Sequence, residues 1–393
     1  MKILTVDTGI SSIIFNLFDM HNEDLLASGI IDGIETENSQ YTIKYNQEVI
    51  TEEIEINNHV EAINILFEKL KTLNIINNSS EINAIGHRIV HGAEIFTDSV
   101  IINDKVISQI EELSEYAPLQ IPYAIKGINA FKEVLPEVLM VASFDTAFYQ
   151  TITKENALYP VPYNWYKDYG IRKYGFQGNS HKYIMDAVKN LLKRDDFKLI
   201  SCHIGNGVSI CAIKDMKCLD TSMGFTPLGG VMMGTRSGDI DPSIIPFVME
   251  REGKNALEVI EDLNKKSGLL GLSEFSNDMR DVFTKSNEGD EMAIIAKNKF
   301  IRRIVDYIAQ YYVLLDGVDL ITFSAGMGEN NIPIRREICE KLSCLGIKID
   351  LDLNNTCGET VKISTDDSKI DVYVIPTNEE LVIARDTKKF VNR

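Results

Sequence analysis

One order of short segments occurs twice in this chain of 393 residues. Each copy begins with three strand-like runs around a glycine turn, at Lys2–Asp7, Ser12–Phe18 and Leu25–Ile31 and again at Lys198–Ile204, Val208–Ile213 and Lys217–Thr221. Helical and strand-like stretches then alternate in both copies, as they do in α/β proteins. The sequence therefore predicts an α/β fold of two duplicated units, with mixed sheets and a cleft between them.

The later elements of each copy follow from their apolar periodicity. In the first half they are a helix at His59–Leu73, a strand at Asn83–Val90, helices near Ile107–Leu113 and Tyr123–Val134, and a strand at Val138–Phe144. In the second half they are a helix at Glu291–Leu315, a strand at Val318–Phe323, a helix from about Ile332, a strand at Val372–Pro376 and a helix at Asn378–Val391. We place the boundary between the halves near residue 150, where no low-complexity linker marks it.

The charge of the chain excludes some classes of partner. It has 40 basic and 58 acidic residues, which gives a net charge of −18. This acidic excess argues against nucleic acid, because contacts to phosphates need a basic face. No run approaches the ~18 apolar residues of a membrane span, and the first strand starts at Lys2 without a secretory leader. Six cysteines without paired C-x-x-C spacing indicate reduced thiols, so we expect a cytoplasmic protein.

Three glycine turns follow strand-like runs, at Asp7-Thr8-Gly9, Gly205-Asn206-Gly207 and Gly326-Met327-Gly328. Glycine lets backbone amides approach a phosphate closely, so three such turns indicate a nucleotide site, although a single one is also typical of hairpins. The chain contains neither the P-loop pattern nor G-x-G-x-x-G. These absences from the sequence argue against a P-loop enzyme and against a Rossmann-type dehydrogenase.

Two arginines stand among glycine-rich and polar neighbours. Arg88 lies at the end of a predicted strand, and Arg236 lies in the segment Gly234–Pro242. A guanidinium group presents a planar fork that matches carboxylate or phosphate oxygens. Either arginine could instead form an interdomain salt bridge, and the residues alone leave both interpretations open.

Two acidic residues complete the candidate set. Asp145 follows the apolar run Val138–Phe144, where a carboxylate can either border a cleft or cap a helix. Near the C-terminus, Thr377 and Glu380 have the spacing of a capping box, which would commit Glu380 to the helix. Glu379 is then the better candidate for a contact to a metal ion or water.

Taken together, these segments resemble the acetate kinase family over essentially the whole chain. The matching stretches are Gly86–Gly92, Phe144–Phe148, Tyr169–Gly175, Cys202–Gly207, Thr221–Leu228, Met233–Pro242, Gly326–Asn330 and Pro376–Leu381. The family belongs to the superfamily of sugar kinases, actin and heat-shock chaperones. The resemblance implies an actin-like (ribonuclease H-like) domain at 1–150, with a helix at about 377–393 packing back on it. It also implies a nucleotide-binding and dimerisation domain at 151–376, and a homodimer.

The resemblance further implies an activity and a set of site residues. The activity is reversible, direct in-line transfer of the terminal phosphoryl group of ATP to a short-chain carboxylate, acetate first, with Mg²⁺ or Mn²⁺, giving an acyl phosphate and ADP. Catalytic positions would be Arg88, Asp145, Gln177 and Arg236, with Val90, Leu119, Phe176 and Pro227 around the acyl group. The nucleotide would contact His203, Ile204, Gly205, Asn206, Gly207, Asp278, Met279, Arg280, Gly326, Met327, Gly328, Glu329 and Asn330, and the metal would contact Asp7 and Glu379.

The sequence also departs from the family pattern within the implied site. The pattern has a serine and a lysine where Ile10 and Ile14 stand, and a phosphoryl-contacting histidine where Gln177 stands. Gln177 can donate a hydrogen bond but carries no charge, and charge-assisted bonds are about twice as strong. Two alternatives follow, namely an acyl kinase with an altered phosphoryl donor or acyl substrate, and a non-catalytic protein that binds nucleotide or acyl phosphate. The two arginines and two acids above are all present, which favours the enzyme.

Overall fold

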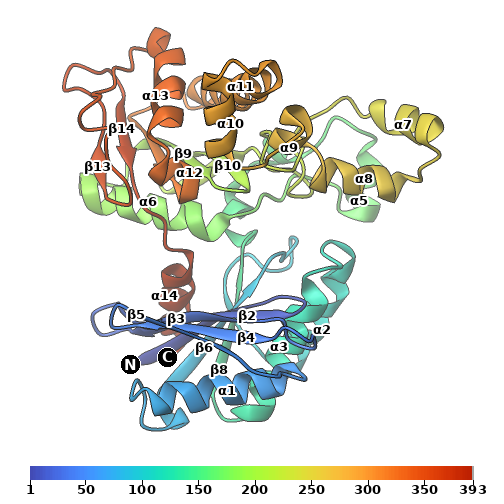
Figure 1. Ribbon diagram of the computed structural model, residues 1–393, viewed down its shortest axis with the longest axis vertical. Helices are drawn as coiled ribbons and strands as arrows, with labels where there is room; N and C mark the ends of the chain where they lie inside the picture. The colour runs from blue at the N-terminus through green and yellow to red at the C-terminus, as the bar shows by residue number, and fades with distance from the viewer. Residues whose placement is uncertain (392–393) are drawn as a thin grey trace. The chain divides into compact units, whose positions relative to one another are not determined.

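The structure is a computed structural model that describes residues 1–391. It divides into two compact units. The first unit contains residues 1–148 and the chain from Asn378 onward, and the second contains Tyr149–Thr377. In Figure 1 the first unit therefore combines the blue and cyan segments with the dark red helix α14 (Glu379–Val391).

The first unit is built on an eight-stranded mixed sheet with the order β5-β4-β3-β2-β1-β6-β8-β7. Its strands are β1 (Lys2–Thr8), β2 (Ser12–Asp19), β3 (Asp24–Asp32), β4 (Gln40–Tyr45), β5 (Glu48–Glu53), β6 (Ile82–Ile89), β7 (Val100–Ile101) and β8 (Leu139–Phe144). β1 to β5 are joined as an antiparallel meander, whereas β6 and β8 run parallel to β1.

The second unit is built on a six-stranded mixed sheet with the order β11-β10-β9-β12-β14-β13. Its strands are β9 (Lys198–Ile204), β10 (Val208–Lys214), β11 (Lys217–Thr221), β12 (Leu320–Ser324), β13 (Val361–Lys362) and β14 (Asp371–Val374). β9, β10 and β11 are antiparallel, whereas β12 and β14 run parallel to β9.

The two sheets share one strand order. In each, the first three strands form a meander and two later strands run parallel to the first one beside it, which gives β3-β2-β1-β6-β8 in one sheet and β11-β10-β9-β12-β14 in the other. The predicted α/β fold with two duplicated units and mixed sheets is thus confirmed. The sequence did not predict β4 and β5. β5 is almost entirely exposed and shows no apolar alternation, whereas β4 does alternate, with Tyr41 and Ile43 buried, and could have been recognised.

Helices cover both faces of the first sheet (Figure 1). They are α1 (His59–Thr72), α2 (Asp104–Glu112), α3 (Ile121–Val134) and α14. A Cβ on Gly86 of β6 would lie 2.6 Å from Ile383 Cγ2 of α14, so glycine lets this helix approach the sheet. The next residue, His87, points to the opposite face, where its ring meets Phe131 of α3 edge-on with the ring centroids 5.5 Å apart.

The helices of the second unit are α4 (Lys154–Ala157), α5 (Tyr163–Tyr169), α6 (Gly178–Leu192), α7 (Ile244–Glu252), α8 (Ala256–Lys265), α9 (Gly268–Ser273), α10 (Met279–Asn287), α11 (Glu291–Leu314), α12 (Ala325–Asn330) and α13 (Ile332–Lys341). Alternate residues of β9 face α6 and the apolar core around α11. The predicted glycine turn at Gly326–Met327–Gly328 is wrong, because β12 leads directly into helix α12.

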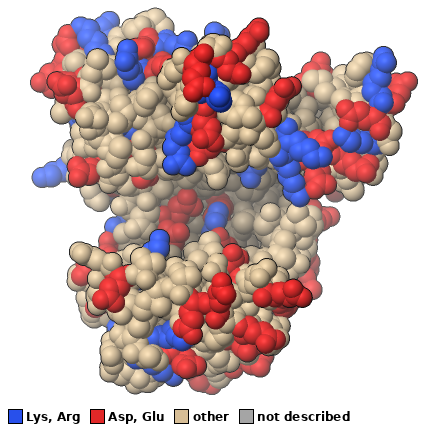
Figure 2. Space-filling view, viewed as in Figure 1, with Lys and Arg blue, Asp and Glu red and all other residues tan. Residues whose placement is uncertain are grey.

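The surface carries charges of both signs. On the face in Figure 2, acidic and basic side chains lie interspersed over each unit, so the acidic excess does not form one continuous patch there. Among the described helices, none combines the length and the apolar character needed to cross a membrane.

Candidate active site

Asp7, Arg88 and Asp145 meet at one edge of the first sheet. They stand at or just after the ends of β1, β6 and β8, three neighbouring parallel strands whose carboxyl ends lie together. Arg88 Nε donates to both carboxylate oxygens of Asp145 at 3.2 Å, and Nη2 donates to Oδ2 at 2.7 Å. Arg88 Nη1 donates to Asp7 Oδ2, also at 2.7 Å. The acids, Asp145 first, hold the pKa of Arg88 well above its ordinary value.

These contacts describe the surroundings of Arg88 and Asp145 within the first unit. Arg88 is ion-paired with Asp7 and Asp145, two acids of its own unit. Asp145 is only 2% exposed, and its carboxylate is committed to Arg88. The guanidinium group has five N–H groups, and two of them remain for an anion beside these bonds.

Glu379 belongs to the same cluster through its electrostatic coupling to Arg88, Asp145 and Asp7. Atoms packed around its carboxylate exclude most water, and this raises the pKa of Glu379 to about 7. Arg88 acts in the opposite direction, while Asp145 adds repulsion. The described residues show no hydrogen bond to this carboxylate, so it is available to a ligand.

The helix cap beside Glu379 differs from the predicted one. Asn378, not Thr377, caps α14, because its side-chain oxygen accepts the Leu381 backbone N–H at 2.9 Å. The Thr377 hydroxyl instead bonds Ser180 Oγ at 2.8 Å. The helix begins at Glu379, one residue later than the capping box requires, so the cap moves by one position.

The acidic side chains near Arg88 could supply some, but not all, of the ligands of a divalent cation. Two carboxylates, of Asp7 and Asp145, contact the single guanidinium group of Arg88, and the carboxyl group of Glu379 is electrostatically coupled to it, so acidic groups outnumber the positive charge. Within residues 1–391, however, no three acidic, histidine or cysteine side chains are gathered closely enough to hold a metal by themselves. This arrangement suits Mg²⁺, which usually takes one or two protein carboxylates and completes its shell with phosphate oxygens and water.

In the second unit, Gln177 and Arg236 lie beside Gly207. A Cβ on Gly207 would be 3.0 Å from Gln177 Nε2 and 3.6 Å from Arg236 Nη1. Arg236 Nη1 has only a carbonyl contact to Pro227 at 3.4 Å and a sulfur contact to Met233 at 3.5 Å. No carboxylate of the described chain pairs with Arg236, and burial lowers its pKa. These two groups are the open donors of the site.

Gln177 also holds an unusual backbone conformation. Its φ of 61° lies in the left-handed region, directly before the first residue of α6. Such a conformation is uncommon for a residue with a side chain, and strained residues cluster at functional sites. The conformation places the amide group beside Gly207 at the N-terminal end of the helix.

A pocket of about 510 Å³ adjoins this turn within the second unit. Its lining residues are Gly205, Asn206, Asn277, Asp278, Met279, Arg280, Gly326, Met327, Asn330 and Asn331. The structure thus brings together predicted nucleotide residues from three separate segments. The sequence analysis missed Asn277 and Asn331, each of which directly adjoins a predicted segment.

Five predicted nucleotide residues do not line this pocket. The Glu329 carboxylate accepts the backbone N–H groups of Ala325 at 2.7 Å and Thr377 at 3.1 Å, so it serves the start of α12. Ile204 is buried, and a Cβ on Gly328 would come within 3.7 Å of it. His203 Nδ1 is bonded to Ser180 Oγ at 2.7 Å. Gly207 borders the open donors.

The predicted acyl-binding residues divide between the units. Val90 and Leu119 belong to the first unit, and Phe176 and Pro227 belong to the second. Leu119 is 61% exposed, whereas Phe176 is buried. The pocket formed by these four side chains therefore stays a prediction.

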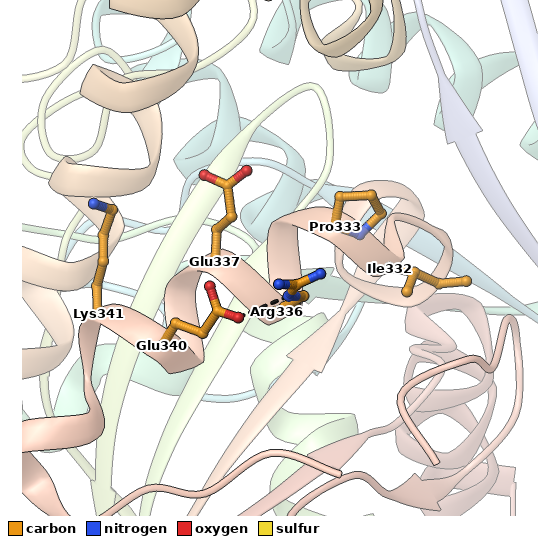
Figure 3. Close-up of a pocket in the computed structure, with 6 residues that line it drawn as sticks. All are labelled: Ile332, Pro333, Arg336, Glu337, Glu340 and Lys341. Atoms are coloured by element: carbon orange, nitrogen blue, oxygen red, sulfur yellow. Dashed lines mark hydrogen bonds and ion pairs between the residues drawn. The ribbon is translucent and has the colours of Figure 1, made fainter. Parts of the chain in front are cut away.

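A second hollow, on α13, carries no predicted residue (Figure 3). Its volume is about 570 Å³, and Arg336 and Glu340 form an ion pair in it at 2.7 Å. Glu337 pairs with Lys297 of α11 at 2.9 Å. Three of its four charged side chains are thus ion-paired, and Lys341 alone shows no ion pair among the described residues.

Comparisons with known proteins bear on the whole chain. A model of the acetokinase family matches residues 2–385. The chain is 50% identical to the acetate kinase of Bacillus velezensis over 387 residues, 98% of each sequence. A crystal structure of Porphyromonas gingivalis acetate kinase matches with a TM-score of 0.95, and one of a propionate kinase from Francisella tularensis subsp. tularensis with 0.92. Each is 38% identical and covers 99% of both chains.

The fold and these relatives show that the protein has an actin-like ATPase fold and is a phosphotransferase with a carboxyl group as acceptor. The prediction of an enzyme is thereby confirmed. The chain belongs to the acetokinase family.

Proposed function

We propose that this enzyme reversibly transfers the terminal phosphoryl group of ATP to a short-chain carboxylate, with acetate as the first candidate. The observation that carries the proposal is the pair of open donors at Gly207, next to Gly205 and Asn206 in the pocket lining. A nucleotide in this pocket, with its phosphates along the 205–207 turn, would direct its terminal phosphate to Gln177 and Arg236.

The proposed chemistry is a direct in-line displacement. A carboxylate oxygen of the acceptor forms a bond to the terminal phosphorus while the bond to the ADP oxygen breaks, and the electron pair leaves with ADP. No base is needed, since the carboxylic acid is already ionised at neutral pH. Arg236 and Gln177 donate to oxygens of the migrating group, and the two remaining N–H groups of Arg88 bind an oxygen of the acceptor or of that group.

Asp7 and Glu379 are the proposed protein ligands of Mg²⁺, and Mn²⁺ has similar ligand preferences. When bound, the ion neutralises charge on the nucleotide phosphates. Glu379 is suited to this role because its carboxylate has no hydrogen-bond partner in the described part of the chain, and Asp7 by its position on the same sheet edge.

The raised pKa of Glu379 predicts a pH dependence. Below about pH 7 the carboxyl group holds its proton and cannot ligate a cation, so activity at limiting Mg²⁺ is expected to fall between pH 8 and pH 6. More Mg²⁺ should shift the inflection to lower pH, because cation and proton compete for one group. Initial rates measured over a grid of pH and Mg²⁺ concentrations check this.

Glu379→Gln provides the control, because the amide cannot titrate in this pH range and has nearly the same size and shape as the carboxyl group. The folded protein binds this proton more tightly than the unfolded chain, so Glu379 makes stability decline as pH rises from about 4.5 to 7. Glu379→Gln should abolish that part of the decline in denaturant unfolding. An inflection that persists in Glu379→Gln at the same pH would exclude Glu379 as its source.

The proposed activity is tested with purified protein, ATP, Mg²⁺ and a carboxylate, with hydroxylamine to trap the acyl phosphate as a hydroxamate. Acetate, propionate and butyrate are compared as acceptors, and ATP, GTP and pyrophosphate as donors. Hydroxamate formed with acetate and ATP supports the proposal. No product with any of the nine pairs would overturn it.

An altered phosphoryl donor is the second candidate, and one observation favours it. Ile14 lies directly opposite Asp7 in the β1–β2 pair, and it is 40% exposed. Residues opposite each other in such a pair share one face of the sheet. An apolar group therefore lies beside Asp7 on this face. Faster turnover with GTP or pyrophosphate than with ATP would establish this candidate.

We also propose a homodimer formed by the second unit. Large apolar side chains are exposed on α5, α7 and α8, and all three helices are drawn toward the same end of that unit in Figure 1. Phe247 is 58% exposed and Leu257 is 80% exposed. Exposed apolar surface of this kind marks protein interfaces, and a second copy of this chain is the partner that the family resemblance implies.

Phe247→Asp combined with Leu257→Asp is expected to convert the dimer to a monomer, because an interface would bury both new carboxylates without partners. Light scattering at defined protein concentrations measures the change. Trp165, the single tryptophan, lies on α5 and is 42% exposed, so its emission should shift to the red on dissociation. A parent protein that is monomeric at tens of micromolar would contradict the proposal.

A reducing compartment such as the cytoplasm is the proposed location. The Sγ atoms of Cys211 and Cys218 lie 3.3 Å apart as free thiols. Thiols persist in this form where the cell keeps cysteines reduced.

A further inference from the structure

We propose that Ser201, His181 and Ser209 form a buried chain of hydrogen bonds that positions Gln177 as a donor to the transferring phosphoryl group. The inference rests on the proposed function, which gives Gln177 its ligand. It adds three positioning residues that do not touch the substrate themselves. It also explains how a neutral amide can serve at this place in the site.

The chain of hydrogen bonds is continuous and shielded from solvent. Ser201 Oγ lies 2.8 Å from His181 Nδ1, and His181 Nε2 lies 2.7 Å from Ser209 Oγ. Ser209 Oγ lies 2.5 Å from Gln177 Oε1. Ser201, His181 and Ser209 are each 0% exposed. β9 supplies Ser201, α6 supplies His181 and β10 supplies Ser209, so three packed elements fix the chain.

The direction of every proton in the chain follows from chemistry. Gln177 Oε1 is an acceptor only, so the single hydroxyl proton of Ser209 is donated to it. Ser209 Oγ must then accept from His181, which places a proton on Nε2. Burial lowers the pKa of His181 well below its ordinary value, so the ring is neutral and carries one proton. Its Nδ1 is therefore an acceptor, and Ser201 donates to it.

The consequence for Gln177 is a fixed amide orientation. An unconstrained amide can rotate by half a turn about its last bond and present either oxygen or nitrogen. The bond from Ser209 holds Oε1 inward, so Nε2 with its two N–H groups faces Gly207 and Arg236. The described protein offers these N–H groups no acceptor. A phosphoryl oxygen at Gly207 would meet two donors, whereas the rotated amide would present a repelling carbonyl oxygen.

A double-mutant cycle tests whether Ser209 acts through Gln177. Ser209→Ala is expected to lower kcat about tenfold, the equivalent of one oriented hydrogen bond, with little change in KM for the carboxylate. In a Gln177→Ala background, the same Ser209→Ala change is expected to have no further effect on kcat. Independent effects that multiply in the double variant would overturn the proposal.

Two further variants separate positioning from folding. Ser222→Ala removes another buried hydroxyl, directly after β11, which accepts the Ile210 N–H at 2.9 Å and shows no hydrogen bond to Gln177 among the described residues. It should lower thermal stability as Ser209→Ala does and leave kcat unchanged. His181→Gln retains a donor near the Nε2 position and should recover much of the kcat that His181→Ala loses. Equal losses of kcat in His181→Gln and His181→Ala, at equal stability, would contradict the proposed hydrogen-bond chain.

Binding of inorganic phosphate distinguishes failure of this inference from failure of the proposed function. If the parent enzyme forms no hydroxamate with any substrate pair, the proposed activity is wrong. Calorimetric titration with phosphate would then still be expected to show weaker binding in Ser209→Ala than in the parent. Gln177→Ala with and without the additional Ser209→Ala change should bind phosphate equally. A difference between these two variants would overturn the proposed hydrogen-bond chain independently of any activity.

Discussion

Replacing Arg236 by alanine is expected to lower kcat by about 10²–10³, the cost typical of losing one preorganised donor to developing charge. Among residues 1–391 no carboxylate pairs with the cation of Arg236, whose Nη1 lies 3.6 Å from the position of a Gly207 Cβ. Its remaining contacts are one carbonyl oxygen and one sulfur, which leave its charge uncompensated. A bound phosphoryl group would supply that compensation. Steady-state kinetics in both reaction directions measures the loss.

Two variants make the Arg236 result specific. Arg236→Lys retains the charge but loses the planar fork, so only part of kcat should return. Arg302→Ala removes an exposed guanidinium of the same unit, paired with Asp306 at 2.5 Å, and should leave kcat unchanged. An Arg236→Ala enzyme that works within threefold of the parent would show that phosphoryl transfer does not depend on this charge.

Much of the fold could be predicted because its core strands are apolar runs with clear ends. The sequence placed Lys198–Ile204 where β9 lies, and it placed the helix at Glu291–Leu315 within one residue of α11. It missed α6, although this helix supplies His181 to the site. Four consecutive residues of its first turn, Gly178–His181, are buried, so its start lacks the pattern of a surface helix.

The sequence could predict which residues belong to the candidate site, but not which of them contact one another. Asp7, Arg88 and Asp145 were each placed at the end of a predicted strand, and parallel neighbours bring such ends together. Which of 58 acids would pair with Arg88 depends on the strand order, which the sequence does not state. The buried chain to Gln177 was likewise hidden, since serines on neighbouring strands show no spacing that distinguishes them from structural ones.

Two adjacent arginines show most simply that the sequence does not reveal the contacts of a side chain. Arg335 and Arg336 are the same residue type at consecutive positions, and both lie on α13. Arg336 is exposed and pairs with Glu340, whereas Arg335 is 0% exposed. Its guanidinium group donates to amide oxygens of four described residues, namely Gly328 and Glu329 at the end of α12 and Asn354 and Thr356 in a later loop. The five bonds measure 2.7–3.0 Å.

These bonds connect Arg335 to the proposed nucleotide pocket. Gly326, Met327 and Asn330 of α12 line the pocket, and Arg335 satisfies carbonyl groups at the end of this short helix. A positive charge at a helix C-terminus is favourable for the macrodipole. Burial lowers the pKa of Arg335, and the guanidinium pKa is high enough for the group to stay charged. Arg335 therefore holds α12 against the loop that contains Asn354.

Arg335→Met is expected to lower the free energy of unfolding by about 3–5 kcal/mol, because several buried oxygens would lose their donors at about 1–3 kcal/mol each before relaxation. At about 2–4 °C per kcal/mol for a unit of this size, the transition of the second unit should fall by roughly 10 °C in calorimetry. KM for the nucleotide should rise as α12 loosens. The matched Arg336→Met should change stability by no more than about 0.5 kcal/mol. Equal effects of the two variants would mean that the buried guanidinium does not hold the helix.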